Sequence, residues 1–303
     1  MSLNSEITRL QNAKNTLKTK LNARNDNQHQ IDDETIDEYG NFVDSIPQGG
    51  GGIDWSEIGY SSEPDIITDG INYAKQIMQN WDSTQTDYSN KFSSNFSLMF
   101  MPTVSTSNGT NFYNMFYNCK RLIYIPQIDT SNGTNFYGMF GSCDALKKIS
   151  LIDTSSGTAM GSMFDGCTSL TTIPQIDTSN NTNFYSMFRG CSSLTTVPTL
   201  NMSSATNVND MFYPCSILEN LGGLTNLGQA YSTSQSANYS SYKLDLSTCS
   251  LLTHDSLMNV INGLYDIATK GCNTQQLVIG STNLAKLTAE EIAIATNKGW
   301  TVS

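Results

Sequence analysis

The sequence has few histidines and few basic residues, and it contains no long apolar run. Its 303 residues include 2 His and 16 Lys and Arg against 27 Asp and Glu, which gives a net charge of -11. Proteins bind phosphate backbones with clustered Lys and Arg, so nucleic acid is not an expected partner. A transmembrane helix needs roughly 18 or more consecutive apolar residues, and no stretch approaches that length. We therefore predict no membrane insertion.

Recognisable catalytic motifs are also missing. His29 lies in a polar segment and His254 precedes Asp255, and neither histidine accompanies a nucleophile in a known motif. Walker and dinucleotide-binding loops do not occur, and no GxS-like stretch has the strand-turn-helix context of a nucleophile elbow. We therefore predict a non-enzymatic protein without cofactor or metal. An unrecognised glycan-cleaving activity is the alternative.

Cysteine, in contrast, recurs at every twenty-fourth position through the middle of the chain. This cysteine ladder consists of Cys119, Cys143, Cys167, Cys191 and Cys215. A constant period of this length predicts a solenoid of stacked turns. No CxxC spacing supports a structural zinc site, so we predict that the ladder cysteines are buried free thiols. Cys249 and Cys272 lie outside the ladder and are expected either to pair or to stay free.

Blocks of this period align six apolar rows. In the first regular block these rows are Met115, Phe116, Cys119, Leu122, Ile125 and Ile128. We predict that the rows point into one continuous core, which each turn shares with its neighbours. The row that follows Met-Phe varies among Tyr117, Gly141, Asp165, Arg189 and Tyr213, so we predict that it faces water. One block earlier, Asn95 occupies the cysteine position and Val104 falls on the last apolar row.

The repeated pattern MFxxCxxLxxIPxIDTSxxTNFYxMFxxC resembles the BspA-like class of bacterial leucine-rich repeats over about residues 90–226. The repeat consensus allows Asn or Cys at one position, which fits Asn95. Ser150 and Asn201 depart from the proline and aspartate of the pattern. The resemblance implies an α+β repeat fold, a solenoid of 24-residue turns, and a binding scaffold of the kind displayed on bacterial surfaces.

The segment before the repeats is predicted to contain three parts. Residues 1–47 form a helical or coiled-coil attachment module, because Leu3, Ile7, Leu10, Leu17 and Leu21 have the spacing of a coiled-coil seam. We expect a homo-oligomer, with a trimer favoured, or alternatively an intramolecular hairpin with a second helix. Residues 48–53 form a glycine-rich linker. Residues 54–89 form a helical cap in which Ile67, Ile71, Ala74, Met78 and Trp81 of a helix over about 65–81 cover the first turn.

Residues 227–303 are predicted to cap the other end with strand-helix units. We expect strands at about 244–246, 277–279 and 300–302, and a helix over about 254–268 that is capped by Thr253. Thr288 and Glu291 have the spacing of a capping box at the start of a second helix.

Both ends of the sequence also resemble tail and appendage proteins of bacteriophages that infect gut bacteria. The similar patterns are EIxRLQNAKxxLKxKL near the start and LTxEEIAIATNKGWTVS near the end. The resemblance implies a virion protein that attaches to other virion proteins through its N-terminal helices. The first residues have no apolar segment of the kind found in signal peptides, so we expect assembly in the host cytoplasm. A purely structural virion component, such as a capsid-decorating head fibre, and a bacterial surface adhesin are the alternatives.

One aromatic row is the candidate partner-binding surface. Tyr113, Tyr137 and Tyr185 share a register with Gly161 and Asn209, and a register that accepts both Tyr and Gly is predicted to face outward. Tyrosine suits a bacterial surface glycan or protein as partner. Ordinary surface tyrosines are the alternative interpretation.

Two further rows are also candidates. Tyr124, Lys148, Thr172 and Thr196 share a register in the predicted strands and could present a second binding face. The aspartate row, Asp129, Asp153 and Asp177, precedes Thr-Ser in each block. We expect these carboxylates either to accept hydrogen bonds in Asx turns or to bind calcium.

Overall fold

The computed structural model describes residues 73–74, 76–99, 101–102, 104–123, 125–230, 242–270 and 272–303. The chain divides into two compact units, Met1–Glu63 and Pro64–Ser303, and all described residues belong to the second. The predicted attachment module with Leu3, Ile7, Leu10, Leu17 and Leu21, and the predicted linker 48–53, lie outside the described residues. The same is true of Ile67, Ile71 and Tyr124.

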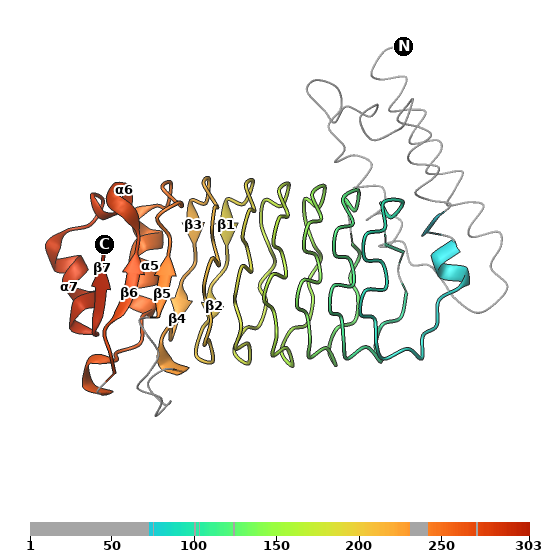
Figure 1. Cartoon of the computed structure of the whole chain (residues 1–303), viewed down its shortest axis with the longest axis horizontal. Helices are drawn as coiled ribbons and strands as arrows, with labels where there is room; N and C mark the ends of the chain where they lie inside the picture. Colours follow the sequence, from blue (N-terminus) through green and yellow to red (C-terminus); the bar gives the residue numbers. More distant parts are fainter. Residues whose placement is uncertain are drawn as a thin grey trace, which may run out of the picture. The chain divides into compact units, whose positions relative to one another are not determined.

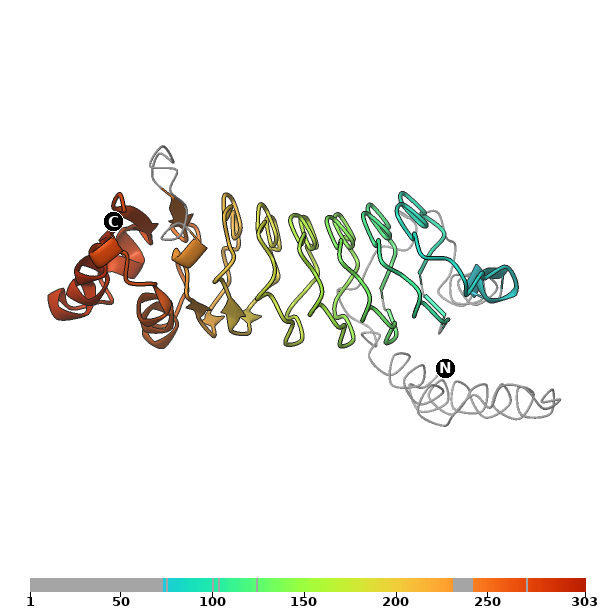
Figure 2. The same cartoon turned by 90° about the horizontal axis from the view of Figure 1, so that it is seen from below.

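The second unit contains a stack of similar turns (Figure 1), which lie side by side in the perpendicular view as well (Figure 2). Parallel bridges join Asp87, Asn111, Asn135, Ala159, Asn183 and Asn207 in this order, each to the residue 24 positions later. Further along the turn, β1 (Thr196–Val197) pairs with β3 (Asn220–Leu221), and β2 (Leu200–Asn201) pairs with β4 (Leu224–Thr225). Both pairs are parallel, and their register has the same spacing as the bridges. The period of the sequence is thus the period of the stacked turns, and the protein has a repeat fold.

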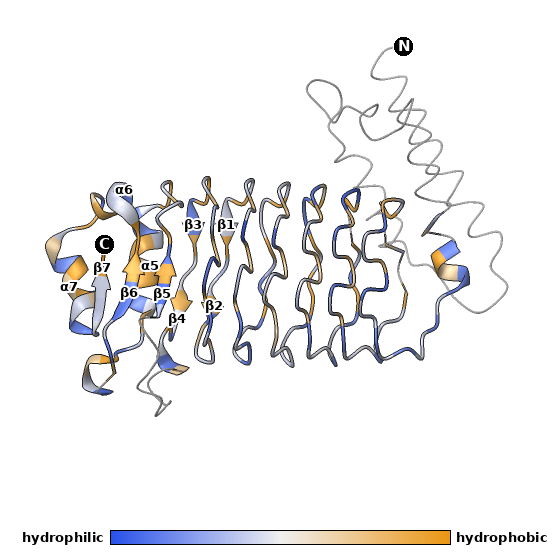
Figure 3. Cartoon of the chain, viewed as in Figure 1, coloured by the Kyte–Doolittle hydropathy of each residue, from blue (hydrophilic) through white to orange (hydrophobic). Residues whose placement is uncertain are grey.

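The apolar rows form the core, as predicted. The Met, Phe, Cys and Leu rows are buried in every regular turn, and so are the two following rows of Ile, Val and Leu. Hydrophobic and hydrophilic segments alternate along each turn (Figure 3). Phe140 stacks on Phe116 at 5.7 Å and on Phe164 at 5.6 Å between ring centroids. Val104 is only partly buried, unlike the later members of its row.

The ladder cysteines are free thiols, and each of them binds the preceding turn. The Sγ atoms of Cys143 and Cys167 donate to the carbonyl oxygens of Phe116 and Phe140, at 3.1 and 3.0 Å. Cys249 lies outside the sequence ladder, yet it is buried and its Sγ points to the Phe212 carbonyl at 3.8 Å. It therefore continues the ladder after a longer turn. Cys272 is partly exposed.

The aspartate row forms Asx turns. Asp129 Oδ1 accepts hydrogen bonds from the backbone N–H and the hydroxyl of Ser131, at 3.1 and 2.7 Å. Asp153 binds Ser155 in the same way. The hydroxyl of Ser131 and then its backbone N–H lower the pKa of Asp129 below the ordinary value. These bonds hold the exposed corner of each turn.

The N-terminal cap differs from the predicted one. The described helical residues end at Gln79, so Trp81 lies beyond the helix instead of on its stripe. Ile77 is buried, whereas Met78 is 49% exposed. Trp81 covers the first turn from outside the helix. Its ring stacks on Tyr88 with 5.4 Å between ring centroids, and its Nε1 donates to the Ser105 carbonyl at 2.7 Å. The helix ends early because Trp81 must turn onto the aromatic stack.

The C-terminal part of the second unit contains a parallel sheet in the order β5 (Lys243–Asp245), β6 (Gln275–Val278) and β7 (Trp300–Val302). The helices are α5 (His254–Gly263), α6 (Gly280–Leu284) and α7 (Ala289–Asn297), with a 3₁₀ turn η1 (Ala268–Lys270).

Both predicted helix starts are confirmed. Thr253 accepts the Ser256 N–H, and Thr288 with Glu291 forms a capping box. Helix α5 is shorter than predicted, because Leu264 leaves it to form a bridge with Leu227. The Tyr265 N–H then donates to the Leu227 carbonyl at 2.9 Å. Among the described residues, no helix has the length and apolarity to cross a membrane.

Candidate functional site

Each turn contains two copies of a four-residue unit. In the turn from Phe112 to Cys119 the sequence is FYNM followed by FYNC. The first and fourth positions of each unit are buried, and the second is Tyr113 or Tyr117, both of which are exposed. Each unit thus exposes the residue at its second position.

The third position of these units has a left-handed backbone conformation, except at Pro214. Asn114 has φ 51° and Asn118 has φ 58°, and the other corresponding residues of the following turns are Gly, Ser or Asp. Left-handed backbone favours Gly and Asn, which explains the choice at this position. The turn then closes with bonds from Met115 N to the Phe112 carbonyl and from Cys119 N to the Phe116 carbonyl. The backbone therefore fixes the direction of the second-position side chain wherever the third position has this conformation.

The second positions of successive turns form two columns, which together we name the outward face. The first column is Tyr113, Tyr137, Gly161, Tyr185 and Asn209, and the second is Tyr117, Gly141, Asp165, Arg189 and Tyr213. Tyr113 and Tyr185 are each 37% exposed, Tyr117 is 41% exposed and Tyr213 is 51% exposed. Tyr137 is partly buried. The predicted tyrosine row is thus one half of a broader aromatic surface.

The three predicted tyrosines do not form one continuous row. Tyr113 and Tyr137 stack with 5.8 Å between ring centroids and 17° between ring planes. Tyr185 lies two turns beyond Tyr137, with Gly161 between them. The first column therefore contains a stacked tyrosine pair and a separate tyrosine.

The two glycines of the outward face are buried, which corrects the prediction that these positions face water. A Cβ atom on Gly141 would come within 3.0 Å of Tyr117 Cδ2, and one on Gly161 within 2.9 Å of Tyr137 Cε2. Each glycine lies under a tyrosine ring of the preceding turn. A variable position thus need not face water when its neighbour covers it.

An ion pair lies beside these glycines. Arg189 Nη1 is 4.0 Å from Asp165 Oδ2, and the Asp165 side chain is 32% exposed. Burial raises the pKa of Asp165, and the Arg189 charge opposes this shift. Because the pair joins adjacent turns of the second column, the outward face carries both charges close together.

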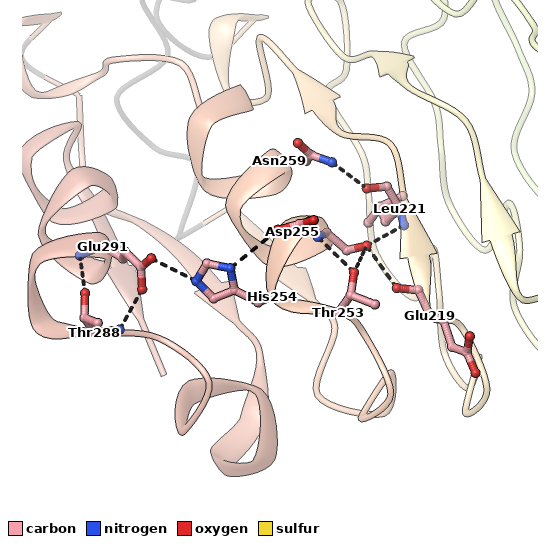
Figure 4. A network of polar contacts seen from close by, with 9 residues as sticks. Glu219, Leu221, Thr253, His254, Asp255, Asn259, Thr288 and Glu291 are labelled. Carbon is pink, nitrogen blue, oxygen red and sulfur yellow. Dashed lines mark hydrogen bonds and ion pairs between the residues drawn. The ribbon is translucent and has the colours of Figure 1, made fainter.

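A polar network connects the C-terminal helices to each other and to strand β3 of the repeats (Figure 4). His254 Nε2 lies 2.8 Å from Glu291 Oε1, and Glu291 also closes the capping box of α7. The Ser256 hydroxyl donates to the Glu219 carbonyl and accepts the Leu221 N–H, both at 2.9 Å. This hydroxyl is committed to backbone groups, so the network connects α5 to α7 and to β3.

Two other surfaces provide less for a partner. Thr172 and Thr196 form a bridge within the strand region, beside exposed Lys148. A shallow depression beside β2 is lined by Gln175, Ile176, Asp177, Thr178, Thr199, Asn201 and Thr225. Within the part of the chain that the structure describes, no group of three or more His, Cys, Asp or Glu residues could hold a metal ion.

The geometry defines a stacked-repeat protein with an aromatic outward face. The chain belongs to the family described as "Mycoplasma protein of unknown function, DUF285", which matches residues 68–148 and 110–226, together more than half of the chain. No curated protein matches it. Among solved structures, it is similar to a leucine-rich repeat protein from Bacteroides ovatus ATCC 8483, with 15% identity and a TM-score of 0.30. The match covers 64% of this chain and 58% of that one, so the chain spans less than two thirds of that structure's length.

Proposed function

We propose that this protein is a non-enzymatic bacteriophage virion appendage, of the tail-fibre or baseplate type, that binds the surface of a host bacterium. In this proposal the repeats form a BspA-like leucine-rich-repeat solenoid and bind a surface glycan or protein. The N-terminal helices attach to other virion proteins. The resemblance of both chain ends to phage appendage proteins supports the virion part of the proposal.

The observation that carries the binding role is the outward face. Interfaces are enriched in tyrosine and arginine, and binding energy concentrates in a few such residues. Four tyrosines of the face are more than a third exposed, and Arg189 lies among them. They extend from a backbone held by bonds between turns, such as Asn114 N to the Tyr137 carbonyl at 2.9 Å. A surface fixed in this way loses little conformational entropy when it binds.

Binding of the labelled full chain to a panel of gut bacterial isolates tests this function. We expect saturable binding to a subset of isolates and its loss in the triple variant Tyr113→Ala, Tyr137→Ala and Tyr185→Ala. The control replaces Gln175 and Thr199 with Ala, because both residues line the depression beside β2 and neither belongs to the outward face. Absence of binding to every isolate would leave the purely structural virion component as the better explanation.

The attachment role has a separate test. A chain that lacks residues 1–47 should keep cell binding, because the outward face starts at Tyr113, but it should not enter assembled particles. Incorporation of the truncated chain at the level of the full chain would show that the attachment site lies elsewhere. Light scattering of the full and truncated chains measures whether these residues also make the protein oligomeric.

A further inference from the structure

One turn of the repeats departs from the others on its exposed side. Residues 146–151 read LKKISL, whereas the equivalent residues of the next two turns read LTTIPQ and LTTVPT. The two buried members, Leu146 and Ile149, are kept. Lys147 and Lys148 are both exposed and stand where the following turns have threonine. The departure is thus confined to positions outside the core.

Strand formation does not account for the two lysines. Threonine has a higher strand propensity than lysine, so Thr171 and Thr172 of the next turn suit the ladder better. Lysine also protects edge strands from further pairing, but this turn is bonded on both sides. The Ala145 N–H donates to the Lys120 carbonyl of the preceding turn, and the Thr171 N–H donates to the Lys147 carbonyl, both at 3.3 Å. The lysines therefore indicate a role at the surface.

Basic residues are not spread evenly along the repeats. Four of the six Lys and Arg residues within 90–226 lie between positions 120 and 148, in adjacent turns, and we name them the basic patch: Lys120, Arg121, Lys147 and Lys148. Lys120 Nζ pairs with Asp144 Oδ2 at 3.6 Å, and the Arg121 guanidinium donates to the Phe96 carbonyl at 3.3 Å. Among the residues that the structure describes, neither Lys147 nor Lys148 forms an ion pair. Two ammonium groups of the patch are therefore available to a ligand.

Exposed ammonium groups select anions. A lysine side chain binds a phosphate or a carboxylate as a compact point charge with three donors. Thr171, in the next turn, is exposed, and its hydroxyl can donate to or accept from the hydroxyls of a sugar. A carbohydrate that carries an anionic group matches both kinds of contact.

The net charge of -11 does not prevent such a contact. Exposed charges are largely screened beyond about 8 Å at physiological ionic strength, so a ligand at the patch mainly experiences the residues around it. A nucleic acid presents a continuous row of phosphates and needs many clustered basic residues, whereas the repeats have one small cluster. A glycan with spaced anionic groups needs only one such cluster.

We infer that Lys147 and Lys148 bind a phosphate or carboxylate group of an anionic surface glycan. The positive charge of Arg121, in the preceding turn, strengthens the attraction. The inference rests on the proposed host-binding function and specifies the chemical class of the ligand. It adds to the outward face a second contact that depends on charge.

The following turns supply the test variant. Lys147→Thr with Lys148→Thr restores the residues that the next two turns hold at these positions, so the fold should be kept. Lys147→Arg with Lys148→Arg keeps both charges. The matched control is Lys243→Gln with Lys270→Gln, which removes two exposed charges outside the repeats. Circular dichroism verifies that all three double variants are folded.

The probes are three soluble polymers applied to the full chain: phosphomannan, polygalacturonate and uncharged dextran. We expect the chain to prefer at least one anionic polymer over dextran, and the threonine double variant to weaken that binding by about tenfold or more, the loss of one good contact. Raising the ionic strength from about 0.1 M to about 1 M should weaken it too, because the screening length falls from about 10 Å to about 3 Å. The arginine double variant and the control should bind as the full chain does. The preferred polymer identifies the ligand group as phosphate or carboxylate.

Four results would overturn the inference. These are the absence of any preference for an anionic polymer, unchanged binding in the threonine double variant, an equal loss in the control, and equally strong binding of duplex DNA. The last result would show that the patch attracts polyanions in general and does not recognise a glycan.

Failure of the basic patch can be told apart from failure of host binding. If the threonine double variant binds bacterial isolates as well as the full chain does, while the triple tyrosine variant does not, the patch is wrong and host binding stands. If the full chain binds an anionic polymer through the two lysines but binds no isolate, the chemistry of the patch is supported and the proposed host-binding function fails.

Discussion

The Cys143 thiol donates to the carbonyl oxygen of Phe116, in the preceding turn, at 3.1 Å. The same bond recurs from Cys119 to Phe92 and from Cys191 to Phe164, at 2.9 and 3.0 Å. Each of these carbonyls also accepts a backbone N–H of its own turn, as Phe116 does from Cys119 at 3.0 Å, so the thiol is a second donor to the same oxygen. The cysteines therefore contribute hydrogen bonds between turns as well as apolar volume.

Thiol reactivity should separate the ladder from the last cysteine. Burial raises the pKa of both Cys119 and Cys249 to about 12, and both are fully buried. The thiolate is the reactive form, so these cysteines should not react with Ellman's reagent at pH 8 until the protein unfolds. Cys272 is partly exposed and should react in the native state.

A Cys272→Ser variant provides the control for this measurement. It should show no fast reaction, while the slow reaction should accelerate with denaturant as in the unmodified chain. Fast modification of more than one thiol in the native protein would contradict the burial of the ladder.

The buried threonine row should contribute to stability through its hydroxyls. Thr154 is 2% exposed, and its Oγ1 donates to the carbonyl of Asp177 in the next turn at 2.7 Å. Thr154→Val keeps the shape but leaves that carbonyl without its donor, which should lower the free energy of unfolding by about 1–2 kcal/mol. Urea unfolding measures the change.

The matched control is Thr158→Val in the same turn. Thr158 is exposed, and its hydroxyl makes a longer bond of 3.3 Å to the Thr134 carbonyl. Water can replace that bond, so the substitution should change stability by no more than about 0.5 kcal/mol. Equal effects of the two variants would show that the buried bond has no special role.

The core could be predicted from sequence because each inward row repeats at one period. Met, Phe, Cys and Leu recur where the structure buries them, and Thr288 with Glu291 was recognisable as a capping box. Cys249 escaped this reasoning because the turn that separates it from Cys215 is longer than the regular ones. Its local pattern, Leu246-x-x-Cys249-x-x-Leu252, matches FxxCxxL in the regular turns and could have identified it.

The outward face was only half predictable. The tyrosine row appeared as a register, but the second column with Tyr117 and Tyr213 did not appear as its companion. The duplication FYNM-FYNC was the available signal, since equal units expose equal positions. The burial of Gly141 and Gly161 could not be predicted, because it depends on how far the rings of Tyr117 and Tyr137 lean toward the next turn.

Asn181 and Met160 should be energetically coupled. Asn181 replaces the glycine of the preceding turns, where a Cβ on Gly133 would come within 2.3 Å of Phe136 Cζ. Its Oδ1 accepts the Met160 N–H at 3.0 Å, and its buried Nδ2 has no partner among the described residues. Met160 stands where neighbouring turns have Phe136 and Phe184. The smaller, flexible methionine leaves room for the amide.

A double-mutant cycle measures this coupling. Met160→Phe alone should overpack the core and destabilise the protein by about 1–3 kcal/mol. Combined with Asn181→Gly, it should restore the regular arrangement of Phe and Gly, so the double variant should be more stable than the sum of the single effects by about 1 kcal/mol. Additive effects would show that the two replacements are independent.

The pair of His254 and Glu291 should make the junction of α5 and α7 sensitive to pH. The hydrogen bond to Glu291 raises the pKa of His254 above its ordinary value of 6.5, with a smaller effect from Asp255. The pKa of Glu291 is lowered from 4.5, first by the Thr288 N–H and also by His254. A raised histidine pKa gives stabilisation that is complete below 6.5 and is lost as pH rises through the raised value. A lowered glutamate pKa gives stabilisation that is present above 4.5 and is lost as pH falls through the lowered value. The pair should therefore stabilise the junction most between these two limits.

NMR titration should show a His254 pKa above 6.5 that returns toward 6.5 in Glu291→Gln, with His29→Gln used to assign the signals. A His254 pKa that does not change in Glu291→Gln would mean that the two side chains do not pair in solution.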